Sequence, residues 1–466
     1  MSAPILWIVF PAILAALLLI FLRDQRATAI VGSVVSAMLA LTAWLLPIDT
    51  VYTIGTFAFK VSPSLDLLGR RLTLTTADQP LLTLIYAAAF AWFTGSAVID
   101  LARRLVPLGL AITAILVGSL AVEPFLYAAL LIEMAVLIAV PMIVPQGQAP
   151  GRGVMRFIIF QTLAMPFILF SGWLLAGVEA NPGNPTLVLF AAILLGLGFA
   201  FLLAIFPFYT RYSMLVEETP PYIAGFILWI FPTAALLFLT IFLERYAWIR
   251  TSAVLPGILA YTGILMVLIG GVLAAFQRDL GRIMAFSMVA ETGFSLLALS
   301  LNSLTGISLF FALFLPRLLS LAGWAFALTI LQKNSPSLRF KDVKGLGRIF
   351  QFASISVGLA NLSLMGLPIL AGFPVRQALV ELLAHQSAGL IGWIFLGSLG
   401  LAIAAVRTLA VLSMAPDGTR WESRENSQQK IFFAIGWALL VLLGLFPQWV
   451  VLIVDRIPVM FEHLGQ

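Results

Sequence analysis

Long apolar stretches recur along this chain from one end to the other. A helix needs about 20 apolar residues to cross the hydrocarbon core of a bilayer. Of the 466 residues, 62% are hydrophobic and 10% are charged, whereas a soluble domain carries roughly 25% charged residues. The sequence therefore predicts an all-α polytopic membrane protein with about 14 transmembrane helices. Their expected ranges are 4–22, 28–47, 80–100, 104–122, 124–145, 154–177, 186–209, 221–244, 253–276, 281–301, 304–331, 350–384, 388–414 and 430–454.

The basic residues are distributed unevenly between the loops that join these spans. Of the 26 Lys and Arg residues, 17 follow odd-numbered spans, and 6 follow even-numbered spans or lie in the C-terminal tail. By the positive-inside rule, the odd loops face the cytoplasm and both termini lie outside. The excess of basic residues thus predicts the topology, and no nucleic-acid partner is needed to explain it. The seventeen include Arg23, Arg26, Arg103, Arg211 and Arg420.

The order of the spans suggests four segments, with no shift of composition that would mark a separate soluble domain. The predicted segments are three N-terminal helices (1–100), a first repeat (101–245), a second repeat (246–415) and a last loop and helix (416–466). The longest polar excursion, 48–79, is expected to be an outside loop with short β segments around 51–61.

Prolines interrupt two of the predicted spans, span seven at Pro207 and span twelve at Pro368 and Pro374. Proline removes a backbone donor and clashes with the preceding helical turn. At membrane depth the freed carbonyls need protein or water, so such breaks line internal cavities; the alternative is that each proline only kinks a helix for packing. The breaks lie five spans apart, and this odd offset predicts two five-helix repeats of inverted orientation.

Four motifs in this order are similar to those of one family of membrane subunits. They are Leu131 to Met134 in span five, Phe201 to Tyr209 in span seven, Gln277 to Phe294 across spans nine and ten, and Gly366 to Arg376 in span twelve. Over roughly residues 80–415 the chain resembles the antiporter-like subunits of respiratory complex I and NDH-type quinone oxidoreductases, and of multisubunit sodium/proton antiporters. The resemblance implies a scaffold in which buried Glu, Lys and His residues pass protons along a central axis.

The chain departs from that family where the family carries its titratable residues. By the resemblance, the lysine of span seven corresponds to Leu202, the Lys or His of span eight to Pro232, and the proline-associated histidine to Tyr209. A lysine between spans nine and ten corresponds to Gly281, and the Lys or Glu of span twelve to Arg376. The five lysines all fall in predicted polar loops. The resemblance thus implies a pump-type scaffold with a degenerate proton pathway.

Four charged residues remain as candidates for that pathway. Glu133 corresponds to the glutamate of the span-five motif; it is either a proton carrier or a vestigial carboxyl kept neutral in the core, since its usual lysine partner is Leu202. Glu291 takes the family's histidine position in span ten and is a candidate for proton exchange. Arg376 is expected to be a gate or counter-ion, because arginine stays protonated in proteins. Arg317 is expected to neutralise Glu291 or Glu133.

The resemblance implies a membrane-arm subunit of a complex-I-like proton-translocating oxidoreductase, with reduced or lost proton conduction of its own. Its partners would be other membrane-arm subunits, a peripheral electron-transfer arm and the lipid bilayer. Quinone and iron–sulfur centres would lie in partner subunits; this chain has no cysteine, which excludes thiolate ligation of a cluster. The expected location is a prokaryotic plasma membrane or a thylakoid. The alternatives are a subunit of a multisubunit cation/proton antiporter, or a structural scaffold of another membrane complex.

Overall fold

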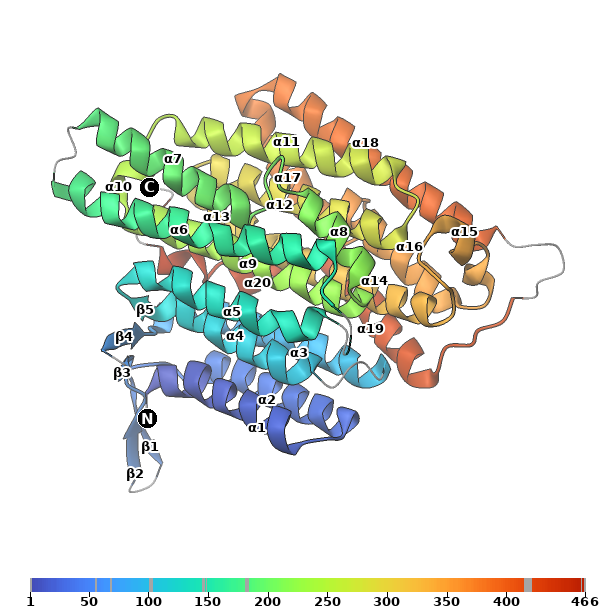
Figure 1. Cartoon of the computed structure of the whole chain (residues 1–466), viewed down its shortest axis with the longest axis horizontal. Helices are drawn as coiled ribbons and strands as arrows, with labels where there is room; N and C mark the ends of the chain where they lie inside the picture. The colour runs from blue at the N-terminus through green and yellow to red at the C-terminus, as the bar shows by residue number, and fades with distance from the viewer. Residues whose placement is uncertain are drawn as a thin grey trace.

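A computed structural model describes residues 2–54, 57–67, 69–99, 104–144, 147, 149–180, 184–414, 421–461 and 463–464. The long helices lie side by side in one bundle, with the short strands gathered at one of its ends (Figure 1). The two ends of the chain are found at this same end of the bundle. Arg103 and Arg420, which were predicted to face the cytoplasm, fall outside the described residues.

Within the described ranges, eleven helices are long and apolar enough to cross a membrane, and three further apolar helices are shorter. They coincide with the predicted ranges, so the all-α polytopic class is confirmed, while the count of fourteen crossings and the inverted repeats stay predictions. The helices are α1 (Phe10–Phe21), α2 (Gln25–Leu45), α3 (Gln79–Ile99), α4 (Leu105–Ala121), α5 (Ala128–Ile143), α6 (Arg152–Ala180), α7 (Pro185–Leu202), α8 (Thr210–Glu218), α9 (Pro221–Arg245), α10 (Ala247–Arg250), α11 (Leu255–Phe276), α12 (Leu280–Ser300), α13 (Leu304–Ala312), α14 (Phe314–Lys333), α15 (Phe340–Val343), α16 (Gln351–Met365), α17 (Gly372–Gln386), α18 (Ala388–Ser413), α19 (Ser427–Leu445) and α20 (Gln448–Val454).

Short strands form the polar excursion between α2 and α3, as the sequence predicted. One antiparallel pair joins β1 and β2, with Val51 opposite Lys60. A second, three-stranded sheet has the order β3-β4-β5 and brings the residues after α4 against this excursion. The strands are β1 (Val51–Ile54), β2 (Phe57–Lys60), β3 (Ser64–Leu67), β4 (Arg70–Thr73) and β5 (Val122–Glu123).

Polar side chains at helix starts explain where several helices begin. Asp24 accepts a hydrogen bond from the backbone N–H of Arg26 before α2, and Asn184 accepts from two N–H groups of α7. Asp279 and Ser303 cap α12 and α13 in the same way. Such caps satisfy N–H groups that have no partner inside the helix.

Two helices, α9 and α12, form the core of the bundle, because every residue in the apolar membrane-spanning stretch of each helix is buried. The sequence of α12 suits this place, since its glycines, serines and alanines allow backbones to approach closely. A Cβ atom at Gly293 would lie 2.6 Å from the carbonyl oxygen of Gly263 in α11. A polar side chain on α12 is therefore surrounded by protein.

The predicted breaks in spans seven and twelve are confirmed. The chain leaves the helix between α7 and α8 around Pro207, and between α16 and α17 around Pro368. Pro374 corrects the prediction, because it is the third residue of α17 and belongs to the helix start. The first turn lacks intrahelical N–H bonds in any case, so proline is tolerated there.

Two further interruptions were not predicted. The span expected at 304–331 divides into α13 and α14, and the last span divides into α19 and α20. Pro316 has no N–H to donate to the carbonyl of Ala312, and Pro447 stands directly before α20. Both divisions thus follow from the missing donor of a proline.

Close packing through glycine also joins α11 to α18. A Cβ atom at Gly271 would lie 1.9 Å from the carbonyl oxygen of Gly397, and one at Gly400 would lie 2.4 Å from the backbone of Gly271. No side chain fits at this crossing without a shift of the two helices.

We expect Gly271→Ala to lower the thermal stability of the full chain in detergent by about 1–3 kcal/mol, because the added methyl overpacks the crossing. The matched control is Gly196→Ala in α7, where the new methyl meets nothing within 4 Å. That variant should melt at or slightly above the wild-type temperature. The melting temperature is measured from the fraction of protein that remains folded after heating. Equal melting temperatures for the two variants would contradict the close contact of α11 and α18 at Gly271.

Candidate functional site

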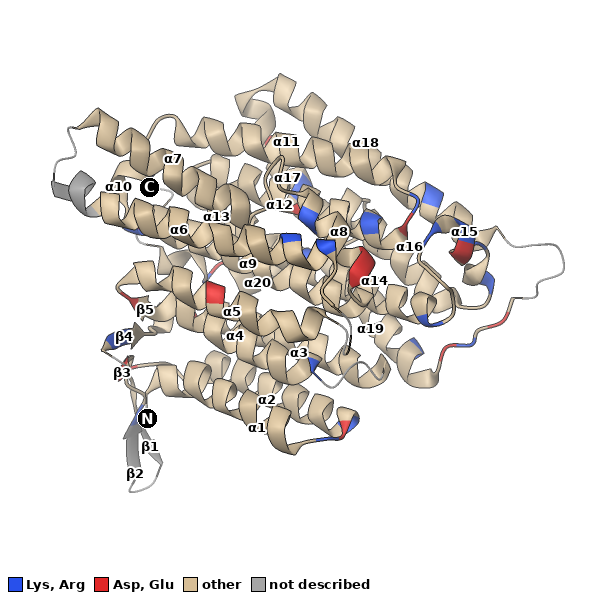
Figure 2. Ribbon diagram, in the orientation of Figure 1, with Lys and Arg blue, Asp and Glu red and all other residues tan. Residues whose placement is uncertain are grey.

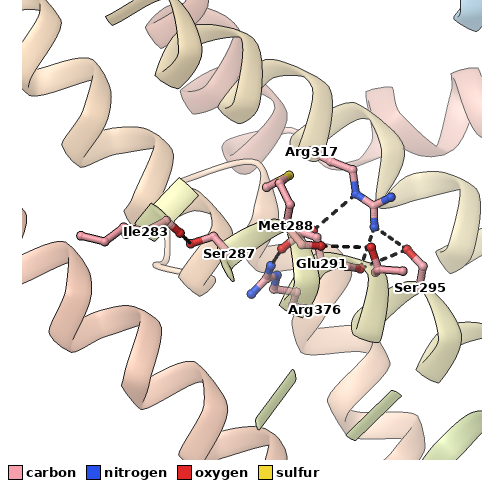
Figure 3. Close-up of polar contacts among 8 residues, drawn as sticks. Ile283, Ser287, Met288, Glu291, Ser295, Arg317 and Arg376 are labelled. Atoms are coloured by element: carbon pink, nitrogen blue, oxygen red, sulfur yellow. Dashed lines mark hydrogen bonds and ion pairs between the residues drawn. The ribbon is translucent and has the colours of Figure 1, made fainter. Parts of the chain in front are cut away.

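Glu291 lies near the middle of α12 with its carboxylate between two arginines (Figure 3). Arg376 of α17 contacts its Oε1 atom through Nη2, and Arg317 of α14 places Nε 4.0 Å from Oε2. The carboxylate is 2% exposed, and the two arginines are 6% and 1% exposed. The structure thus brings together three of the four predicted residues from three different helices.

Further contacts fix the orientation of the two guanidinium groups. Arg317 Nη2 donates to the backbone oxygen of Glu291 and to Ser295 Oγ, both at 2.6 Å. Ser295 Oγ in turn donates to the same backbone oxygen at 3.2 Å. The guanidinium of Arg376 lies 4.1 Å from the centre of the Phe294 ring, a distance at which a cation is attracted to the ring face.

The break in span twelve places Arg376 in this cluster. Helix α16 ends at Met365, and the next residue, Gly366, has a φ of +88°, a conformation that favours glycine. The chain then turns and restarts as α17 at Gly372. A Cβ atom at Gly366 would lie 3.2 Å from Cδ of Arg376, so glycine both ends the helix and leaves room for the arginine stem.

The cluster carries two guanidinium cations and one carboxylate, a net positive charge in the core of the bundle. Nη1 of Arg317 and Nη1 of Arg376 are buried and have no hydrogen-bond partner among the described residues. These donors are suited to ordering water. No group of three His, Cys, Asp or Glu residues in the described part of the chain is arranged to hold a metal ion.

Arg211 forms a second buried cation that sequence reasoning misplaced. The charge pattern predicts Arg211 in a cytoplasmic loop, but it belongs to α8 and its side chain is fully buried. Nη2 of Arg211 donates to the backbone oxygen of Leu202 at 2.7 Å and to Tyr212 Oη at 3.3 Å. Because α7 ends at Leu202, that carbonyl has no helical donor. A cation close to a proline break was the signal that could have identified this role.

Glu133 lies apart from the Glu291 cluster. It is half-buried on α5, where Thr162 of α6 donates to its Oε1 atom at 2.7 Å. Its Oε2 atom is buried without a hydrogen-bond partner among the described residues. Arg317 was predicted to neutralise either Glu291 or Glu133, and the structure pairs it with Glu291.

The positions that depart from the family motifs lie along the same core. Leu202 is the last residue of α7 and is buried. Tyr209 precedes α8, with its ring centre 6.0 Å from that of Phe286 in α12. Pro232 is buried within α9, and Gly281 lies in the first turn of α12.

Residues 160–403 match the family described as NADH:quinone oxidoreductase/Mrp antiporter, transmembrane. The "NADH-quinone oxidoreductase subunit N 1" of Solibacter usitatus is 30% identical over 287 residues, 58% of this chain and 57% of that relative. The match therefore spans less than two thirds of the relative.

Two solved structures share the fold over nearly the whole chain. One is a chain of the archaeal membrane-bound sulfane sulfur reductase, with a TM-score of 0.82, 16% identity and coverage of 98% of this chain and 97% of that one. The other is a chain of respiratory complex I from Thermus thermophilus, with a TM-score of 0.80, 17% identity and 98% coverage of both chains. Both belong to multisubunit membrane complexes.

We expect Glu291→Gln to destabilise the full chain strongly, because the two buried guanidinium groups would lose their shared carboxylate. Removing one partner of a buried ion pair typically costs about 3–5 kcal/mol. The measurement is the amount of folded protein recovered and its melting temperature in detergent. Glu133→Gln is the matched control, since its side-chain oxygen can still accept from Thr162, and it should stay close to wild type. A melting temperature of Glu291→Gln equal to that of the wild type would refute the ion pairs of Glu291 with the two arginines.

Proposed function

The chain belongs to the NADH:quinone oxidoreductase/Mrp antiporter transmembrane family, and from this we propose that it is a membrane-arm subunit of a complex-I-like proton-translocating oxidoreductase. In this proposal the subunit has no active site and binds no redox cofactor. Quinone and iron–sulfur centres belong to the partner subunits and the peripheral electron-transfer arm. The similarity to a quinone oxidoreductase subunit and to a chain of complex I supports this assignment.

The second part of the proposal is that this subunit's own proton conduction is reduced or lost. The observation that carries it is the cluster around Glu291, in which both side chains facing the carboxylate are arginines. A carrier must accept a proton and release it again. Lysine can do so when burial shifts its pKa, but an arginine stays protonated. The two arginines of the cluster are therefore suited to hold a fixed positive charge and not to pass protons on.

The first half of the chain supports the same conclusion. Leu202, where the family carries a lysine, has no titratable group. The cation near this break is Arg211, which is held by the Leu202 carbonyl. Fixed positive charges beside a narrow polar path repel protons and other cations. Each of the two breaks at Pro207 and Pro368 thus has a permanent cation close by.

The remaining role is to complete the membrane arm or to transmit coupling between its neighbours. The ion pairs of Glu291 tie α14 and α17 to the core helix α12. A broken helix held in this way can move only together with its ion pair. The subunit is thus suited to passing a movement from one neighbouring subunit of the arm to the next.

We place the subunit in a prokaryotic plasma membrane or a thylakoid, with both termini outside. Figure 2 supports this orientation, because Lys and Arg gather toward the end of the bundle with α15, away from the chain ends. That end is cytoplasmic by the positive-inside rule.

The alternatives are a subunit of a multisubunit cation/proton antiporter or a scaffold of another membrane complex. The family description covers Mrp antiporters as well as quinone oxidoreductases. The two assignments differ in whether an electron-transfer arm is attached.

Mild extraction of the tagged protein from its native membrane should recover quinone-reductase-type electron-transfer subunits, identified by mass spectrometry. A membrane subunit of an oxidoreductase remains bound to the subunits that carry the cofactors. An unrelated membrane protein with the same tag serves as the control. Recovery of small antiporter subunits alone would transfer the assignment to a cation/proton antiporter.

We expect Glu133→Gln to leave the proton-to-electron ratio of the intact complex unchanged. Its carboxyl is hydrogen-bonded by a neutral threonine and lies apart from the Glu291 cluster. The measurement is proton uptake into vesicles per electron transferred. Substitution of the corresponding glutamate in another antiporter-like subunit of the same complex is the control and should lower the ratio. A lowered ratio in Glu133→Gln would show that Glu133 carries protons.

A further inference from the structure

A groove runs along the outer face of the bundle between α11 and α18, beside their glycine crossing. Its volume is about 530 Å³. Its apolar wall includes Val272, Phe276, Leu399 and Ile403, of which the last three are more than a third exposed. The glycines bring the backbones of the two helices into contact, and the side chains that flank this contact form the two walls of the groove. The wall is of a kind that accommodates an acyl chain.

One end of the groove is marked by two arginines. Arg278 follows the last residue of α11 by two positions and is exposed, and Arg407 lies on α18. Arg407 is six residues before the end of α18, about 9 Å along the helix axis. Both cations thus lie near the end of a membrane-spanning segment, where a lipid headgroup is found.

Arg407 is held in position by its surroundings. Its Nη1 atom donates to the carbonyl oxygen of Ala275, and its guanidinium lies 5.4 Å from the centre of the Phe340 ring in α15. The backbone of Arg278 is fixed too, because its carbonyl oxygen accepts from the N–H of Phe340 at 2.9 Å. The packing of α11, α15 and α18 therefore brings both arginines to the same end of the groove.

No carboxylate of the described chain forms an ion pair with Arg278 or Arg407. The two acidic side chains close by in sequence are engaged elsewhere. Asp279 accepts from the backbone N–H of Arg282, and Asp342 accepts from the hydroxyl of Ser337. Among the described residues, Arg278 and Arg407 thus have no carboxylate partner.

We propose that this groove binds an anionic phospholipid, with an acyl chain along the apolar wall and the phosphate between Arg278 and Arg407. Basic pockets between membrane helices suit such headgroups, and each arginine contributes about fivefold to binding. The inference does not depend on the proposed function, since it rests only on this face of the chain.

The test is native mass spectrometry of the full chain in a neutral detergent, titrated with phosphatidylglycerol or with phosphatidylcholine. Wild type should retain phosphatidylglycerol in preference. Removing both charges in R278Q/R407Q should weaken retention roughly 25-fold. The matched control R23Q/R152Q removes two exposed arginines that do not line the groove, one before α2 and one at the start of α6, and should bind as wild type does. Equal retention of both lipids by wild type, or unchanged retention by R278Q/R407Q, would overturn the proposal.

A second pair of variants tests the apolar wall. Ile403→Trp fills the groove from an exposed position and should reduce retention while leaving the melting temperature near wild type. Unchanged retention would overturn the acyl-chain site. Because the chain has no cysteine, Ile403→Cys gives a single reactive thiol for cross-linking in the intact complex. No cross-link is expected if lipid occupies the groove; a cross-link to another subunit would show that protein covers it.

Discussion

The structure depends on one constraint, that a charged group inside a membrane bundle needs a partner within the protein. Glu291 satisfies it with two arginines, and these come from α14 and α17, so one carboxylate fixes three helices. The core position of α12 makes this possible, because a side chain at its middle is surrounded on all sides. The polar centre of the protein is therefore also a packing element.

The proline breaks connect this centre to the rest of the bundle. At each break a helix ends, and its last carbonyls need donors that the helix no longer supplies. Near Leu202 the donor is Arg211, and after Gly366 the restarted helix delivers Arg376. In many transporters broken helices of this kind surround the ion site, whereas the cations at the breaks of this chain are arginines, which keep their charge. These fixed charges are consistent with the stationary role that we propose.

Much of the fold could be predicted because lipid imposes a simple pattern on the sequence. The apolar ranges, the β segments near residues 51–61 and the breaks at Pro207 and Pro368 all follow from local rules. The hydropathy pattern predicts continuous spans through Pro316 and Pro447, but both prolines interrupt helices. The predicted span seven ends at residue 209, so the sequence places Arg211 in the loop that follows it. Only the positions of α7 and α8 show that it is buried.

The sequence alone determined the membrane class and the family, since both rest on hydropathy and on motifs whose residues are close together in the chain. It also determined that no lysine stands at Leu202 or Arg376. The tertiary structure alone decided that Glu291 meets Arg317 and Arg376 while Glu133 meets Thr162. These partners are distant in the chain, and a hydropathy pattern contains no information on which face of a helix meets which neighbour. The physical role of each charge therefore became clear only from the packing of the helices.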